Sequence, residues 1–100
     1  MDDLTPRQRK YLRAEAHHLR PNVQIGKLGL SESVIEETSR SLDSHELVKV
    51  KFVDCKTERR DLSQKLAESC QADLVALIGN ISILYREHLN EEKRNYKLPH

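Results

Sequence analysis

The residues with the clearest chemical potential in this 100-residue chain are two glycines three positions apart, in Gly26-Lys27-Leu28-Gly29. Glycine lets the backbone turn sharply and approach a ligand closely because it has no Cβ. A helix that follows such a turn would direct its unpaired N–H groups and positive dipole end at an anion such as phosphate. Lys27 would add a positive charge. The same spacing is common in simple turns, so the motif alone leaves both interpretations open.

Positive charge is concentrated around this motif, although the net charge of the chain is only +1. Six bases and one acid give the segment from Thr5 to Lys27 a balance of +5. The next segment, up to Val48, has a balance of −4, and Lys49 to Lys65 returns to +3. A folded chain can gather such segments into one positive face, although each could equally be a solvated surface. The candidates for a positive face are Arg9, Lys10, Arg13, Arg20, Lys49 and Lys51.

Residue types that serve catalysis or metal binding lack the necessary spacing in this chain. Cys55 and Cys70 form no C-x-x-C pair, and no P-loop or nucleophile elbow is present. His45 beside Glu46 could act as a general base, but a position in a turn explains it better. The sequence therefore predicts a protein that is not an enzyme and that binds no metal, cofactor or small-molecule substrate.

Composition and the N-terminus indicate where the chain would reside. It contains no run of ~18 apolar residues that could form a membrane span. The start, Met1-Asp2-Asp3, is acidic and has no apolar segment of the kind found in signal peptides. Two cysteines without a framework pattern are typical of reduced thiols. We therefore expect a cytoplasmic protein that does not associate with membranes.

The first half of the chain shows clear start signals for two helices. Thr5-Pro6-Arg7-Gln8 combines a capping box with Pro at the first helical position, and this helix should extend to about His18 or Leu19. The β-prone segment 22–25 leads into the glycine motif, after which Ser31 can cap a helix ending near Ser44. Residues 46–53 alternate apolar and basic side chains, as in a strand with Lys49 and Lys51 on one face.

The second half predicts a third helix and a hairpin. Thr57 could cap a helix that buries Leu62, Leu66 and Cys70. Residues 72–78 and 81–86 read as strands joined by a two-residue turn at Gly79-Asn80. Residues 87–100 are polar and without periodicity, so we expect a partly disordered or loosely docked tail. The predicted organisation is one domain over residues 1–86 and a C-terminal tail over residues 87–100.

The element order α-β-α-β-α-β-β predicts an α/β (α+β) fold with a small mixed sheet and helices packed against it. Several blocks along the chain then match one family in their order. The first are Ala16-His17-His18-Leu19-Arg20-Pro21 and Val23-Gln24-Ile25-Gly26-Lys27-Leu28-Gly29-Leu30. They are followed by His45-Glu46-Leu47-Val48-Lys49-Val50-Lys51-Phe52, Val75-Ala76-Leu77-Ile78-Gly79 and Leu84-Tyr85-Arg86. From Leu4 to Arg86 the chain thus resembles the CRM domain (chloroplast RNA splicing and ribosome maturation) in its stand-alone prokaryotic, YhbY-like form.

The resemblance implies a two-layer α/β fold like the C-terminal domain of bacterial translation initiation factor three. Its four-stranded mixed sheet would have the strand at 22–25 at one edge, followed by 46–53, 81–86 and 72–78. The resemblance also implies RNA binding through Gly26, Lys27, Leu28 and Gly29 and through the basic surface beside them. Single-domain bacterial members are linked to precursors of the large ribosomal subunit, which points to large-subunit ribosomal RNA or pre-ribosomal particles as the partner.

The sequence leaves open two alternatives to a role in ribosome assembly. Multi-domain plant relatives assist intron splicing, so a splicing or RNA-chaperone role would use the same surface on a different RNA. A protein-interaction adaptor would instead use the acidic second helix. Nothing in the sequence requires an assembly larger than a monomer.

Overall fold

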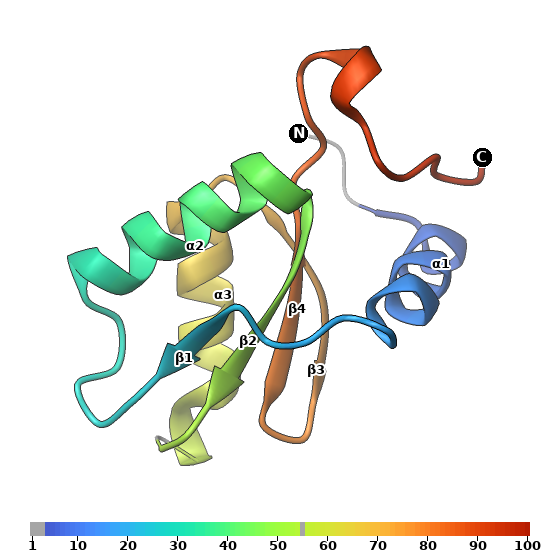
Figure 1. The fold of residues 1–100 in the computed structure, drawn as a ribbon. Coiled ribbons are helices and arrows are strands. Elements are labelled where there is room, and N and C mark those ends of the chain that lie inside the picture. The colour runs from blue at the N-terminus through green and yellow to red at the C-terminus, as the bar shows by residue number, and fades with distance from the viewer. Residues whose placement is uncertain (1–3, 55) are drawn as a thin grey trace.

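The computed structural model describes residues 4–54 and 56–100, so the expectations for Met1-Asp2-Asp3 and Cys55 fall outside the described residues. The described chain contains three α-helices and a four-stranded sheet (Figure 1). In order, the elements are α1 (Pro6–Ala16), β1 (Val23–Ile25), α2 (Glu32–His45), β2 (Leu47–Phe52), α3 (Arg59–Ser69), β3 (Asp73–Ile78) and β4 (Ile81–Tyr85). Short 3-10 helices cover Lys56–Glu58 and Glu91–Lys93.

The sheet has the strand order β1-β2-β4-β3, as expected from the family resemblance. β1 pairs with β2 in parallel, and β4 pairs with both β2 and β3 in antiparallel orientation. The β3–β4 ladder contains an irregularity between Leu74 and Ala76. The predicted fold class and its mixed sheet are therefore confirmed.

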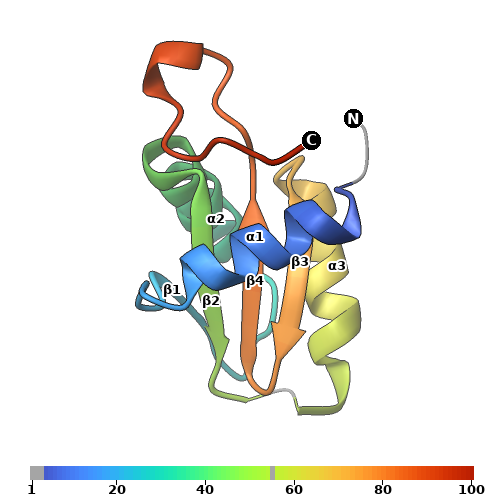
Figure 2. The same ribbon diagram turned by 90° about the vertical axis from the view of Figure 1, so that its right-hand side faces the viewer.

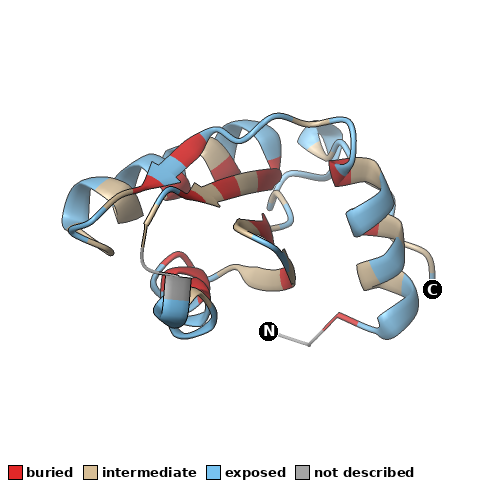
Figure 3. Ribbon diagram, turned by 90° about the horizontal axis from the view of Figure 1, so that it is seen from below, coloured by how far each residue is buried: buried red, intermediate tan, exposed pale blue. Residues whose placement is uncertain are grey.

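Helices cover both faces of this sheet. One cluster of buried residues joins α2 and α3 to Val48, Val50 and Phe52, which alternate along β2. A second cluster joins α1 to Leu47 and other residues of the opposite sheet face. Figure 2 shows α1 crossing this face with α2 and α3 behind the sheet, and Figure 3 shows the buried positions concentrated between these layers. The sheet and the α2–α3 layer are the two layers that were expected, and α1 forms a third layer on the other face of the sheet.

Local signals account for most element boundaries. Thr5 and Gln8 form the predicted capping box, in which Thr5 Oγ1 accepts from Gln8 N at 3.1 Å. α1 nevertheless ends at Ala16, earlier than predicted, because the chain turns there toward β1. The prediction that Thr57 caps the third helix is wrong: a 3-10 turn precedes α3, and its N-cap is Glu58.

The C-terminal tail packs on the domain more closely than its polar sequence predicted. Tyr96 and Leu98 contact the α1-side core cluster. Gln8 Nε2 donates to Pro99 O at 3.1 Å, which ties the end of the chain to α1. Two apolar residues form too short a pattern for the sequence to have predicted this docking. Across residues 4–54 and 56–100, no helix has the length and apolar character to cross a membrane.

Candidate nucleic-acid interface

The glycine motif forms a hydrogen-bonded turn at the end of β1. Gly29 N donates to Gly26 O at 3.0 Å, which places Lys27 and Leu28 at the tip. Both tip side chains are exposed, and Leu28 is 92 % exposed. Gly29 has φ = +68°, a conformation that favours glycine, whereas Gly26 does not need one. A Cβ on Gly26 would meet nothing within 4 Å, so the space above this residue is open for a ligand.

The turn leads directly into the N-terminus of α2. Ser31 caps the helix, since its Oγ accepts from Val34 N at 3.2 Å. The positive end of the helix dipole therefore lies next to Lys27. Glu32 in the first helical turn offsets part of that positive potential.

The cations of β2 lie on the sheet face that α1 covers. Lys51 pairs with Gln24, two residues before the glycine turn, so its side chain is close to the start of the loop. Lys49 lies one pair further along the sheet, and its Nζ donates to Leu19 O at 3.0 Å. Lys49 thus holds the connection between α1 and β1, in which Arg20 is exposed.

The cations of α1 separate into two groups. Lys10 and Arg13 are exposed on the solvent side of the helix. Arg9 instead donates through Nη1 to Leu74 O and to Val75 O, the latter at 3.2 Å, at the irregular point of β3. Because β3 and β1 form opposite edges of the sheet, the structure places Arg9 away from the glycine turn.

Of the residues that the sequence singled out, the structure brings Lys27, Lys51 and Arg20 to the β1 side of the sheet. Sequence reasoning missed two further polar residues at this end of the sheet: Gln24 beside the glycine turn and Arg59 beside the β3–β4 hairpin. Gln24 pairs with Lys51, and Arg59 Nη1 donates to Gly79 O at 3.2 Å in the β3–β4 hairpin. The +3 balance of residues 49–65 was the signal that could have indicated Arg59.

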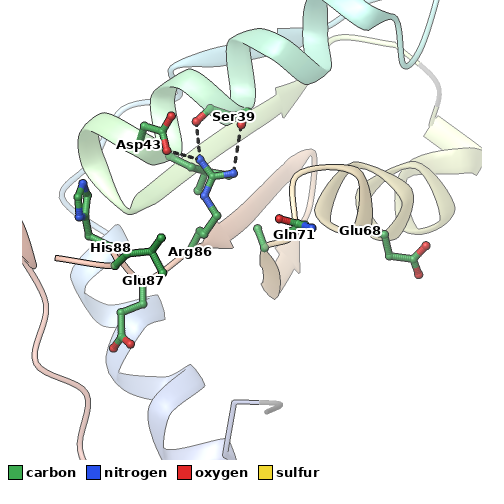
Figure 4. A pocket seen from close by; sticks show the side chains of 10 residues that line it. Ser39, Asp43, Glu68, Gln71, Arg86, Glu87 and His88 are labelled. Carbon is green, nitrogen blue, oxygen red and sulfur yellow. Dashed lines mark hydrogen bonds and ion pairs between the residues drawn. The ribbon is translucent and has the colours of Figure 1, made fainter. Parts of the chain in front are cut away.

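A cavity of about 820 Å³ lies at the other end of the strands, between α2, α3 and the start of the tail. Arg86 bonds the polar groups of this cavity: its Nη2 donates to Asp43 Oδ1 at 2.7 Å and to Ser39 O at 2.8 Å (Figure 4). Its Nη1 donates to Cys70 O at 2.7 Å. Glu68 and Glu87 also line the cavity, so it does not suit a phosphate. Burial raises the pKa of the Cys70 thiol, and Arg86 only partly offsets this.

In the part of the chain that the structure describes, no three His, Cys, Asp or Glu residues are grouped so that they could hold a metal ion.

A domain model described as "CRS1 / YhbY (CRM) domain" matches residues 4–86. The chain belongs to this family. The CRM domain thus comprises the sheet, all three α-helices and the glycine turn.

Two bacterial relatives of this CRM domain match it over nearly their full lengths, and an archaeal relative matches it over part of its length. "Probable RNA-binding protein YqeI" of Bacillus subtilis is 35 % identical over 97 residues, which cover 96 % of this chain and 99 % of that protein. An "RNA-binding protein" of Haemophilus influenzae is 36 % identical over 100 residues, covering 99 % of this chain and 98 % of the relative. A third, "Probable RNA-binding protein MJ0652" of Methanocaldococcus jannaschii, is 37 % identical and is covered over 73 % of its length.

The solution structure of the Staphylococcus aureus protein SAV1595 has the same fold. Its TM-score against this CRM domain is 0.81 at 34 % sequence identity, and the match covers 96 % of this chain and 99 % of that one. A match of this extent includes most of the C-terminal tail. This tail lies beyond the residues that the domain model matches.

Proposed function

We propose that this CRM domain binds ribosomal RNA through the glycine turn and the adjacent basic surface, and that it acts in assembly of the large ribosomal subunit. The observation that carries the proposal is the turn itself. It presents Lys27 on a backbone with open space at Gly26, directly before the N-terminus of α2. The names of the bacterial and archaeal relatives as RNA-binding proteins support the class of ligand.

The residues of this surface would make different kinds of contact with RNA. Gly26 and Gly29 would let an RNA strand approach the backbone, and Lys27 would contact a phosphate next to the positive end of α2. Lys51 and Arg20 would extend the contact along the β1 side of the sheet. Lys10 and Arg13 would add phosphate contacts from α1.

Arg9 and Lys49 would take part indirectly. Both donate to backbone carbonyls, so they position the irregular part of β3 and the α1–β1 connection, respectively. Their positive charges would still contribute to the long-range attraction of RNA. We propose a monomer that acts in the cytoplasm without membrane, cofactor or small-molecule substrate.

Crosslinking in living cells tests the proposal most directly. RNA crosslinked to the protein would be sequenced for the wild type and for Gly29→Asp, which places a negative charge in the turn. We expect large-subunit ribosomal RNA to dominate the wild-type sample and its recovery to fall at least about tenfold in the variant, equivalent to ~1.4 kcal/mol. The positive φ at position 29 should cost about 1–2 kcal/mol of stability, and the built Cβ lies 3.9 Å from Leu62 Cδ1, an ordinary contact.

A matched control tests whether the loss of RNA depends on where the negative charge is added. Gln71→Asp adds an acid at another exposed residue with positive φ, in the turn before β3 and at the far end of the sheet. This variant should bind RNA like the wild type. Recovery of intron or messenger RNA without large-subunit RNA would indicate a splicing or chaperone role. Recovery of protein partners on the acidic side of α2, without RNA, would favour an adaptor.

A further inference from the structure

Exposed aliphatic side chains gather at one end of the sheet. Among the described residues, four large hydrophobic side chains are strongly exposed, and three of them lie at the end that carries the glycine turn (Figure 1). They are Leu28 at 92 %, Val53 at 56 % and Ile78 at 51 %. The fourth, Leu89 at 96 %, lies at the opposite end, after β4. An apolar group of this kind beside a charged loop indicates a contact surface.

The pairing of the strands places four residues in one row at this end. Gln24 of β1 pairs with Lys51 of β2, and Lys51 pairs with Ile81 of β4. Ile81 in turn pairs with Ile78 of β3. Directly paired residues point to the same face of a sheet. Ile81 contacts the α1-side cluster, so all four side chains of this end row lie on the α1 face.

The layer that contains α1 covers the preceding row of the sheet more completely than the end row. Ile83, which pairs with Lys49 one row earlier, is only 2 % exposed. Ile78 in the end row is 51 % exposed, and Gln24 at the other edge is exposed as well. Figure 2 shows the ends of β2, β3 and β4 uncovered beside α1. The end row is thus exposed at Gln24 and Ile78, at the two edges of the sheet, and half-buried at Lys51 and Ile81 between them.

We propose that the end row of Gln24, Lys51, Ile81 and Ile78 is a subsite for one unpaired nucleotide of the bound RNA. Lys51 would contact the phosphate, the two isoleucines would contact the face of the base, and the Gln24 amide would contact a polar edge of the nucleotide. Neighbouring strands are ~4.8 Å apart, so Lys51 and Ile78 are separated by about 10 Å, a distance that one nucleotide can span. The inference rests on the proposed RNA-binding function and specifies the form of RNA that the site accepts.

The chemistry of the row favours RNA over a protein partner. It contains a cation and no acid, and it adjoins Lys27, so its charge complements a phosphate backbone. Four residues are too few for a stable protein interface, which typically involves 20–30 residues on each side. Hydrophobic contact is non-directional, so an aliphatic surface accepts the face of any base, and the subsite would select an unpaired nucleotide with little regard to base identity.

The test compares two RNAs that differ in one nucleotide: a fully paired ribosomal RNA stem and the same stem with a single bulged residue. Wild-type protein should bind the bulged RNA at least about fivefold more tightly, equivalent to ~1 kcal/mol. Ile78→Ser should lose this preference and keep its affinity for the paired stem. Leu89→Ser, which makes the same kind of change at the other end of the sheet, should behave like the wild type.

A second variant protects the test from effects on folding. Gln24→Ala changes an exposed side chain on an edge strand and should also weaken binding of the bulged RNA, although less than Ile78→Ser. Thermal unfolding of each variant identifies any that fails to fold. Equal affinity of the wild type for both RNAs, with no effect of Ile78→Ser, would overturn the subsite and leave the proposed function standing. Failure of the wild type to bind either RNA would overturn both.

Discussion

Tyr85 is a residue whose buried hydroxyl works against the stability of the fold. Its side chain is only 2 % exposed, and its Oη has no hydrogen-bond partner among the described residues. Burial raises the pKa of Tyr85 strongly, and the negative charges of Glu87 and Glu46 raise it further. The ring itself packs well, in an edge-to-face contact with Tyr96 at a centroid distance of 6.5 Å.

Replacing Tyr85 with Phe should keep the ring contact and remove the unpaired hydroxyl. We expect Tyr85→Phe to raise the free energy of unfolding by up to about 1 kcal/mol, because an unsatisfied buried donor is costly. Because folding raises the pKa of Tyr85, the stability of the wild-type protein is unaffected by this group below the pKa of the unfolded state, which is about 10. Above that pH the wild-type protein loses stability, since the unfolded state releases the Tyr85 proton more readily than the folded state does. The variant should therefore lose less stability between neutral and strongly alkaline pH. Denaturant unfolding over that range would measure both effects, and an unchanged alkaline slope would contradict the second.

At the scale of elements, Glu46 connects the end of α2 to the C-terminal tail. It has φ = +64° at the C-cap of α2, and it is only 1 % exposed. Its Oε2 accepts from His88 N at 2.7 Å, and its Oε1 accepts from Asn95 N. The backbone oxygen of Glu46 also accepts from Arg86 N at 2.9 Å. One buried carboxylate thus holds both ends of the tail's loop, where the sequence suggested only loose docking.

Glu46→Gln should release the tail because an amide offers one acceptor and places an NH2 group against a backbone N–H. We expect a loss of about 2 kcal/mol in the free energy of unfolding, in the range found when a buried hydrogen-bond partner is removed. Hydrogen exchange should show faster exchange at His88 and Asn95. Glu37→Gln on the exposed side of α2 is the matched control and should change neither quantity. Unaltered exchange in Glu46→Gln would show that the apolar contacts of Tyr96 and Leu98 hold the tail without it.

At the scale of the whole molecule, the charge segregation seen along the chain becomes a difference between surfaces. The β1 side of the sheet carries Lys27, Lys51 and Arg20, whereas α2 and the cavity around Arg86 are rich in acids. A molecule with almost no net charge can therefore still attract RNA in one orientation, with its basic surface first.

The salt dependence of RNA affinity should report the number of phosphate contacts that this surface makes. Affinity should fall steeply between low and moderate salt, and Lys27→Gln should reduce the slope of log affinity against log salt by about 0.7–0.9, the value for one contact. Lys93→Gln in the tail removes the same charge at the opposite end of the strands from the glycine turn and should leave the slope nearly unchanged. Affinity that does not vary with salt would contradict a phosphate-led site.

Features encoded by neighbouring residues were predictable from the sequence. The Thr5 and Ser31 caps, the Gly79 turn and the alternation along β2 all occur as expected, because capping and periodicity depend on residues within a few positions. The same is true of the glycine turn at residues 26–29. Thr57 was misassigned because a 3-10 turn competes with the same capping signal.

The sequence by itself therefore determined the elements, their order and the residue types of the candidate site. Only the tertiary structure decided which cations face solvent: Arg9 and Lys49 are drawn to backbone carbonyls that lie far away in sequence. It also decided that Gln24, Lys51, Ile81 and Ile78 form one row, and that Gln24 and Ile78 at its two ends stay exposed. The physical reason is that strand register and helix placement arise from burying two sheet faces at once, and no local pattern records which distant residues then become neighbours.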